Sequence, residues 1–185
     1  MLKLNAKELR TTPVDEKEAK AIKKNPITII LDNVLDTYNV GSIFRLADAV
    51  AAAKVILCGA TLTPPNSRIK KASINTTGWV NWEYAERAAD VVKKLHEQGV
   101  TVVAVEQDPR SKPYHTADYR FPIAIVVGNE TTGVSKEVLD MSDIIVELPM
   151  WGVNRSLNVM VSAGIILYEI LSVQGRSASG GKQHE

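Results

Sequence analysis

Short apolar runs, rich in β-branched residues, alternate along this chain with segments of helical spacing. The runs fall at residues 27–31, 54–58, 101–105, 123–127 and 144–148. Helical spacing is found at residues 40–52, 87–98, 134–141 and 156–172, and a shorter helix is expected around residues 15–24. Continuous apolar strands between helices are typical of a parallel sheet that is covered on both faces. The sequence therefore predicts an α/β fold with a mostly parallel sheet flanked by helices.

Length and composition are compatible with one folded unit. The chain has 185 residues, of which 45% are hydrophobic, and this is enough to bury one proper core. We expect a single domain over residues 26–172, preceded by a basic, partly helical extension at residues 1–25. The segment at residues 173–185 is rich in glycine and serine, so we expect it to be a disordered tail.

Several classes of protein are disfavoured by the composition. A net charge of +1 gives no global nucleic-acid signature, so any attraction to RNA must come from local patches. The one cysteine, Cys58, lies in an apolar run and is expected to be a buried small hydrophobe without a disulfide partner. One cysteine and three histidines offer no zinc-ligand spacing, so no metal is expected. No run reaches transmembrane length and the N-terminus is polar, which predicts a cytoplasmic protein.

The segment after the apolar run at residues 123–127 reads Gly128-Asn129-Glu130-Thr131-Thr132-Gly133. Gly128 allows the backbone to turn at the carboxyl end of the strand, and Gly133 is expected to open a helix at residue 134. In open α/β sheets, ligands bind at this end of the strands. Strand-to-helix turns that contain glycine are common, so the segment alone does not identify a function.

A second segment, Asn39-x-Gly41-x-x-x-Arg45, follows the first apolar run. Asn39 stands where the N-cap of the helix at residues 40–52 belongs, so capping is one interpretation. Arg45 lies among apolar neighbours in the second turn. A lone arginine there is usually a surface charge with a buried stem, and this alternative stays open for the segment taken by itself.

A third segment begins with Leu148-Pro149-Met150 and continues with Ser156-Leu157-Asn158-Val159 and a long apolar helix. Ser156 is placed to cap that helix. In their order and spacing, the three segments together resemble the SpoU family of RNA 2′-O-ribose methyltransferases, within the SPOUT superfamily. The resemblance covers approximately residues 26–172.

The resemblance implies features that the apolar pattern does not show. Members of this superfamily thread their C-terminal segment through a loop, which makes a deep trefoil knot. They bind S-adenosylmethionine in the knot and work as homodimers with the active site near the subunit interface. In this chain the knot would be built from residues around 103–107, 126–133, 147–152 and 155–165.

The resemblance also implies roles for particular residues. The positions that match the cofactor pocket of the family are Val105, Gly128, Leu148, Met150 and Leu157. The positions that match its catalytic set are Asn39, Arg45, Glu130, Ser156 and Asn158. Arg45 matches the arginine proposed to assist deprotonation of the ribose hydroxyl. Because a guanidinium with a pKa above about 12 is a poor base, we interpret Arg45 as a phosphate clamp that lowers the pKa of the hydroxyl.

The other four catalytic positions are expected to orient or to bind. We expect Glu130 to orient either Arg45 or the loop through charge-assisted hydrogen bonds. The amides of Asn39 and Asn158 can hold the substrate ribose, the loop or each other. Ser156 can donate to a phosphate at the N-terminus of its helix, and polar satisfaction within the fold is the alternative for all four.

Substrate choice depends on weaker signals. Lysines and arginines in residues 1–25, and the cluster Arg68, Lys70 and Lys71, can contact phosphates without reading sequence. The compact architecture resembles family members that modify tRNA, so tRNA is favoured over rRNA. A non-catalytic RNA-binding relative is the alternative, although such a protein is expected to have lost Arg45, Glu130 or Asn158. A nicotinamide-dependent oxidoreductase is disfavoured because no Gly-x-Gly-x-x-Gly follows the first strand.

Overall fold

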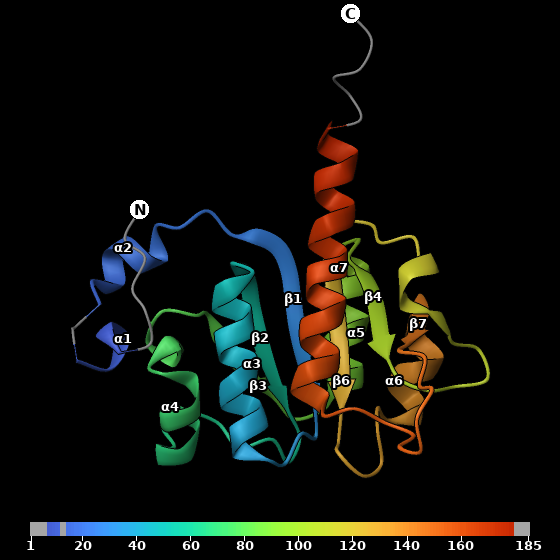
Figure 1. The fold of residues 1–185 in the computed structure, drawn as a ribbon, viewed down its shortest axis with the longest axis horizontal. Helices are drawn as coiled ribbons and strands as arrows, with labels where there is room; N and C mark the ends of the chain where they lie inside the picture. Colours follow the sequence, from blue (N-terminus) through green and yellow to red (C-terminus); the bar gives the residue numbers. More distant parts are fainter. Residues whose placement is uncertain (1–6, 12–13, 180–185) are drawn as a thin grey trace, which may run out of the picture.

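The computed structural model describes residues 7–11 and 14–179, and within them seven strands form one parallel sheet (Figure 1). The strands are β1 (Asn25–Asp32), β2 (Ala52–Cys58), β3 (Trp82–Ala85), β4 (Thr101–Val105), β5 (Lys112–Pro113), β6 (Ile123–Gly128) and β7 (Ile144–Glu147). They lie in the order β3-β2-β1-β6-β4-β7-β5, and each pair of neighbours is parallel. The predicted parallel α/β sheet is therefore confirmed.

Helices cover both faces of this sheet (Figure 1). They are α1 (Glu8–Thr11), α2 (Glu16–Lys20), α3 (Thr37–Ala49), α4 (Ser67–Ser73), α5 (Ala88–Glu97), α6 (Lys136–Met141) and α7 (Val159–Ser179), with short 3-10 turns η1 (Thr76–Gly78) and η2 (Tyr114–Thr116). The core on one face contains residues of α3, α4 and α7, and the core on the other contains residues of α5 and α6. No helix of the described residues is long and apolar enough to cross a membrane.

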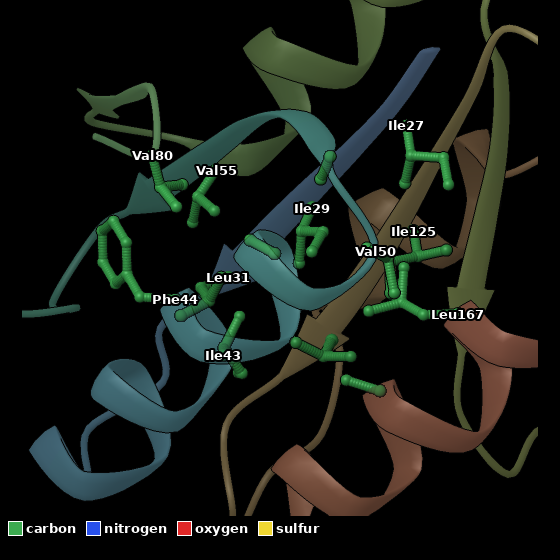
Figure 2. Close-up of a cluster of buried hydrophobic side chains, with 14 of the residues drawn as sticks. Ile27, Ile29, Leu31, Ile43, Phe44, Val50, Val55, Val80, Ile125 and Leu167 are labelled. Atoms are coloured by element: carbon green, nitrogen blue, oxygen red, sulfur yellow. The ribbon is translucent and has the colours of Figure 1, made fainter. Parts of the chain in front are cut away.

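The central strands are buried on both faces, which explains their continuous apolar sequences. Ile29 and Leu31 of β1 point into the core beneath α3, while Ile30 between them points into the core beneath α5. Figure 2 shows Ile29 and Leu31 packed with Ile43 of α3, near Leu167 of α7. All five side chains are fully buried. This packing fixes the orientation of α3 and α7, and both helices begin at the carboxyl edge of the sheet.

Cys58, at the end of β2, is buried as expected. Burial, followed by the charges of Asp32 and Glu83, raises the pKa of its thiol to about 12. The thiol therefore stays protonated near neutral pH and behaves as a small hydrophobic group.

Helix α3 begins earlier than the sequence pattern predicts. We expected a start at residue 40 with Asn39 as the N-cap, but the helix starts at Thr37 and its N-cap is Asp36. The Asp36 carboxylate accepts a hydrogen bond from the backbone N–H of Tyr38 at 2.8 Å. Aspartate and asparagine cap equally well, and the earlier of the two takes the position here. Asn39 therefore lies in the first turn, where its side chain is buried and available for other partners.

Both ends of helix α7 differ from the prediction of residues 156–172. The helix starts at Val159, and the Asn158 side chain accepts from the backbone N–H of Met160 at 2.9 Å, so Asn158 rather than Ser156 caps it. The far end runs to Ser179, through residues that we expected to belong to a disordered tail. Val173 packs partly against the core there and extends the helix. The rest of the predicted tail, residues 180–185, lies outside the described residues.

Candidate functional site

A cavity of about 460 Å³ opens at the carboxyl edge of the sheet, between β6, β4 and β7. Its walls are the loops that follow these three strands and the segment that leads into α7. Ligands of open α/β sheets bind at this edge, because loops from neighbouring strands converge there. The fold therefore brings together segments that are far apart in the sequence.

The residues predicted to bind a cofactor all line this cavity. They are Val105, Gly128, Leu148, Met150 and Leu157. Glu130, Ser156 and Asn158 of the predicted catalytic set line it as well, whereas Asn39 and Arg45 do not. The walls thus combine apolar side chains with about as many polar ones, so the cavity offers both apolar surface and several hydrogen-bonding groups to a small organic ligand.

Glu130 connects the loop after β6 to the loop that enters α3. Its carboxylate accepts hydrogen bonds from the backbone N–H groups of Leu35 and Asp36, each at 3.1 Å. It also accepts from the side-chain amide of Asn39 at 2.9 Å. Of the two roles expected for Glu130, orientation of the loop is the one that the structure supports.

Asn39 extends this network to the start of α7. Its side-chain oxygen accepts a hydrogen bond from the Asn158 amide at 3.0 Å, while its own amide donates to Glu130. Both polar atoms of the Asn39 side chain are therefore used. Of the alternatives for the two asparagines, the structure shows the one in which they hold each other. A continuous chain of hydrogen bonds joins three segments around the cavity.

These contacts also change the acidity of Glu130. Partial burial alone raises the pKa of its carboxyl group. The hydrogen bonds from Asn39 and from the backbone N–H groups of Leu35, Glu130 and Asp36 outweigh this effect and hold the pKa below its usual value. The ionised form is the one that fits the network.

Replacing Glu130 with glutamine is expected to lower the free energy of unfolding at pH 7 by about 1 kcal/mol or less, because the group is largely exposed to solvent. A carboxyl group with a lowered pKa stabilises the fold above its unfolded-state pKa of about 4.3, and this contribution is lost as the pH falls through the folded-state pKa. The difference between the two proteins should therefore shrink at low pH. Urea unfolding at pH 7 and pH 3 measures it, with the exposed Glu97→Gln as control. An equal difference at both pH values would contradict the lowered pKa.

Arg45 stands apart from Glu130. It is exposed on α3 and makes no hydrogen bond or ion pair within the described part of the chain. The structure shows no hydrogen bond from Arg45 to Glu130, whose carboxylate binds backbone amides and Asn39 instead. The guanidinium of Arg45 keeps all its donors available.

Ser156 also lies differently from the prediction. It is exposed at the rim of the cavity, three residues before the first residue of α7. It therefore does not sit at the N-terminus of that helix, and no effect of the helix dipole applies to it.

Two residues that sequence reasoning missed hold the cavity walls together. The Glu106 carboxylate accepts from the backbone N–H groups of Val134 and Gln107, each at 2.9 Å. The Gln107 side-chain amide donates to the backbone carbonyl of Arg155 in the loop before α7. Glu106 and Gln107 thus join the loop after β4 to the loop after β6 and to the loop before α7. Its position directly after an apolar run was the available signal, because polar residues there lie at the ligand edge of the sheet.

The loop after β6 is a tight turn anchored by further polar groups that the sequence did not single out. Asn129 and Gly133 exchange two backbone hydrogen bonds, at 3.1 Å and 2.9 Å. The Asn129 amide donates to the backbone carbonyl of Asn33 at 2.9 Å, and Asp32 accepts from the backbone N–H of Ser135 at 2.9 Å. These contacts fix the loop against the end of β1.

The glycines at both ends of this turn are required by close approach. A Cβ at Gly128 would lie 2.1 Å from two backbone atoms, one in Gly133 and one in Val134. At Gly133 the backbone is left-handed, with φ of +71°, and a Cβ would lie 2.1 Å from the Glu106 carboxylate. Neither position accepts a side chain without displacing the cavity wall.

The described residues contain no group of three or more histidines, cysteines, aspartates or glutamates that is placed to hold a metal ion. The polar groups that line the cavity are amides, carboxylates, the hydroxyls of Thr131, Ser156 and Ser162, the guanidinium of Arg155 and the backbone. This arrangement can hold and orient an organic ligand that has apolar and polar parts. The free guanidinium of Arg45 can bind an anion bidentately.

Comparison with known proteins gives a consistent set of relatives. The SpoU rRNA Methylase family matches residues 26–168. A tRNA (guanosine(18)-2′-O)-methyltransferase of Aquifex aeolicus is 35% identical over 153 residues, covering 80% of this chain and 69% of that protein. A 23S rRNA (guanosine-2′-O-)-methyltransferase of Ralstonia nicotianae is 31% identical over 161 residues, covering 87% of this chain and 64% of that protein. This chain thus spans about two thirds of the length of these curated relatives.

Solved structures agree with the sequence matches. The A. aeolicus TrmH/SpoU tRNA modifying enzyme superposes with a TM-score of 0.78 and 28% identity, covering 94% of this chain and 84% of that one. An AdoMet-bound rRNA methyltransferase from Sinorhizobium meliloti gives a TM-score of 0.76 and 29% identity, covering 84% of this chain and 60% of that one. The region matched by the family, residues 26–168, includes all three segments that line the cavity.

Proposed function

Because this chain belongs to the SpoU rRNA methylase family, we propose that it transfers a methyl group from S-adenosylmethionine to the 2′-hydroxyl of a ribose in RNA. One observation carries the proposal. The residues that match the cofactor and catalytic positions of the family, apart from Asn39 and Arg45, converge on a single cavity at the carboxyl edge of the sheet. Asn39 is hydrogen-bonded to two members of that set.

The cavity fits the cofactor in size and in chemistry. Its volume of about 460 Å³ lies within the usual range for small-molecule sites. Val105, Leu148 and Leu157 supply apolar wall for the adenine, and the backbone near Gly128 supplies polar partners for the ribose. When bound, the cofactor supplies an activated methyl group on a positively charged sulfur. No metal is needed, because the leaving group is already activated.

The protein must also bind the RNA next to the cofactor and ease the loss of the hydroxyl proton. We assign Arg45 to the phosphate beside the target ribose, where its positive charge lowers the pKa of the hydroxyl. This role agrees with an exposed guanidinium that has no partner among the described residues. Ser156, exposed at the cavity rim, is assigned as a second donor to the RNA.

Glu130, Asn39 and Asn158 act as positioning residues in this proposal. Their hydrogen bonds join the start of α3, the loop after β6 and the start of α7. Arg45 lies on the same helix as Asn39, so the network sets its position relative to the cavity. Small displacements of the reacting groups cost large factors in rate.

For the substrate we favour tRNA, and rRNA is the alternative. The relatives named above include enzymes for each. The match to the A. aeolicus tRNA enzyme, at 35% identity, is somewhat stronger than the match to the R. nicotianae rRNA enzyme, at 31% identity, and this supports tRNA. A non-catalytic RNA-binding role is disfavoured because all five predicted catalytic residues are present.

Two further family properties are proposed for this chain. We place a deep trefoil knot around the cavity, which a crystallographic chain trace would test. We also propose a homodimer, because Val161, Ile165 and Tyr168 leave an apolar stripe exposed at helical spacing on α7. Light scattering after gel filtration distinguishes a dimer from a monomer, and a monomer at all concentrations would reject this part.

Methyl transfer from labelled S-adenosylmethionine to total tRNA and, separately, to rRNA tests the central proposal. Label should enter tRNA, and nuclease digestion should locate it on a 2′-O-methylated nucleotide. Label found only in rRNA would keep the chemistry and overturn the substrate. If the protein bound no cofactor, the proposal as a whole would be rejected.

A further inference from the structure

A second cavity, of about 740 Å³, lies at the opposite end of the sheet from the first. It is bounded by the N-terminal segment through Leu9 and Val14, by α4 and the loop before it, and by the residues around η1 and the start of β3. The predicted cofactor pocket shares no lining residue with it. The proposed methyl transfer assigns no role to this second cavity.

Two indole rings give this cavity an aromatic wall. Trp79 is buried, with 6% of its surface exposed, and its ring nitrogen donates to Asp48 at 2.7 Å, which fixes the ring. Trp82, at the start of β3, is half-buried and lines the same cavity. Aromatic rings at an open cavity are suited to stacking on a planar ligand.

Two asparagines beside the indoles each retain an unused polar atom. The Asn66 oxygen accepts from the backbone N–H groups of Arg68 and Ile69, and none of the described residues accepts from its amide nitrogen. The Asn75 amide donates to the backbone carbonyl of Leu9 at 3.2 Å, and none of the described residues donates to its oxygen. The cavity thus offers one free donor and one free acceptor, the combination that the edge of a nucleobase requires.

The rim of the cavity is positively charged. Lys70 lines it, and Arg68 and Lys71 stand beside Lys70 on α4. All three side chains are exposed, and none forms an ion pair with the described residues. Unpaired cations next to a stacking surface fit a phosphate attached to a base.

We propose that this cavity binds one unpaired nucleotide of the RNA, separate from the nucleotide that is methylated. The base stacks on Trp82 and pairs its edge with Asn66 and Asn75, and its phosphate meets Lys70. The inference rests on the proposed function only in taking RNA as the substrate. Single-stranded bases splayed onto aromatic side chains are the usual mode of RNA recognition by proteins.

The position of the cavity in the fold agrees with this role. Helix α4 packs directly against α3, which carries Arg45 (Figure 1). Both helices cover the same face of the sheet. An RNA strand that places a phosphate at Arg45 can therefore continue across α3 to the cavity beside α4.

Three substitutions test the proposal in the full chain. Asn66→Ser keeps a capping oxygen but removes the amide. Lys70→Gln removes one charge, and Ser67→Phe fills the cavity from the first residue of α4 without changing charge. Lys93→Gln, an exposed lysine on α5 on the opposite face of the sheet, is the matched control. The probes are total tRNA and a fluorescent single-stranded oligoribonucleotide, and S-adenosylmethionine affinity and melting temperature are measured in parallel.

We expect each of the three variants to bind both RNAs about 3- to 10-fold more weakly, and Lys70→Gln to lower the slope of log affinity against log salt by about 1. Cofactor affinity should stay at the wild-type value, and Lys93→Gln should behave as wild type. Wild-type RNA affinity in Asn66→Ser and Ser67→Phe would overturn the inference, as would a loss explained by a lower melting temperature.

The outcome separates this inference from the proposed function. If wild-type protein methylates no RNA but the three variants still bind RNA more weakly than the control, the cavity stands and the enzymatic proposal fails. If methylation occurs and RNA affinity is unchanged, the enzyme stands and the cavity fails. If wild-type protein binds no RNA, both are rejected.

Discussion

Replacing Arg45 with alanine should lower the rate of methyl transfer by at least about 100-fold and leave S-adenosylmethionine affinity within about twofold of wild type. The side chain is exposed and makes no hydrogen bond or ion pair with the described residues, so its removal should not disturb the fold. In the proposed mechanism, the substitution removes the positive charge that stabilises the developing alkoxide and holds the neighbouring phosphate. Single-turnover rates with saturating RNA measure the effect on the chemical step. Arg120→Ala, which removes another exposed arginine, is the control.

Arg45→Lys separates two roles for the guanidinium. Lysine keeps the charge but loses the bidentate fork, so a phosphate clamp should retain part of its activity and bind RNA more weakly. If the guanidinium acts as the base, Arg45→Lys is not expected to retain partial activity. If Arg45→Lys kept full affinity for cofactor and RNA but lost all turnover, the phosphate clamp would be the wrong description.

Gly128→Ala should abolish cofactor binding and lower the free energy of unfolding by at least about 2 kcal/mol. The added Cβ would lie 2.1 Å from backbone atoms of Gly133 and Val134, which cannot move aside as a flexible side chain can. Gly133 is held in place by its two backbone hydrogen bonds to Asn129. The clash therefore has to displace the cavity wall. Urea unfolding and cofactor titration measure the two effects.

Gly152→Ala is the matched control for this substitution. Gly152 lies in the loop between β7 and α7, and a Cβ there would meet no atom within 4 Å. Its stability and its cofactor affinity should stay close to wild type. If Gly128→Ala kept the wild-type stability and cofactor affinity, the turn would be able to open. The close approach of the backbone at Gly128 to that at Gly133 and Val134 would then not define the shape of the cavity.

The strands were largely predictable because burial on both faces leaves a continuous apolar signal. The predicted strand at residues 101–105 matches β4 at both ends. The short edge strands β3 and β5 gave no such signal, since they are partly exposed and only four and two residues long. Helix ends were less predictable, because several residues in a row can act as caps. Asp36 took the cap expected at Asn39, and Asn158 took the one expected at Ser156.

The candidate site was predictable where the motifs of the family mark it. The five expected cofactor residues meet at one cavity, although their separation in the sequence gives no hint of this. The hydrogen-bond partners of the charged side chains were not predictable. Glu130 was expected to orient either Arg45 or the loop. The sequence could not show that it would do so through the backbone amides of Leu35 and Asp36, because a backbone amide is present at every residue except proline. Glu106 was missed for the same reason, because its partner Val134 contributes only its backbone N–H.

The hydrogen bond between Asn39 and Asn158 joins residues that are 119 positions apart. At about 5–20 residues per second, a ribosome makes the second asparagine roughly 6 to 24 s after the first. During this interval the early strands and α3 can form, but the Asn39 oxygen still lacks its partner and one wall of the cavity does not yet exist. Each new copy of the protein therefore passes several seconds of its synthesis with the first cavity incomplete, and a nascent chain that stops before α7 is expected to lack the proposed cofactor site.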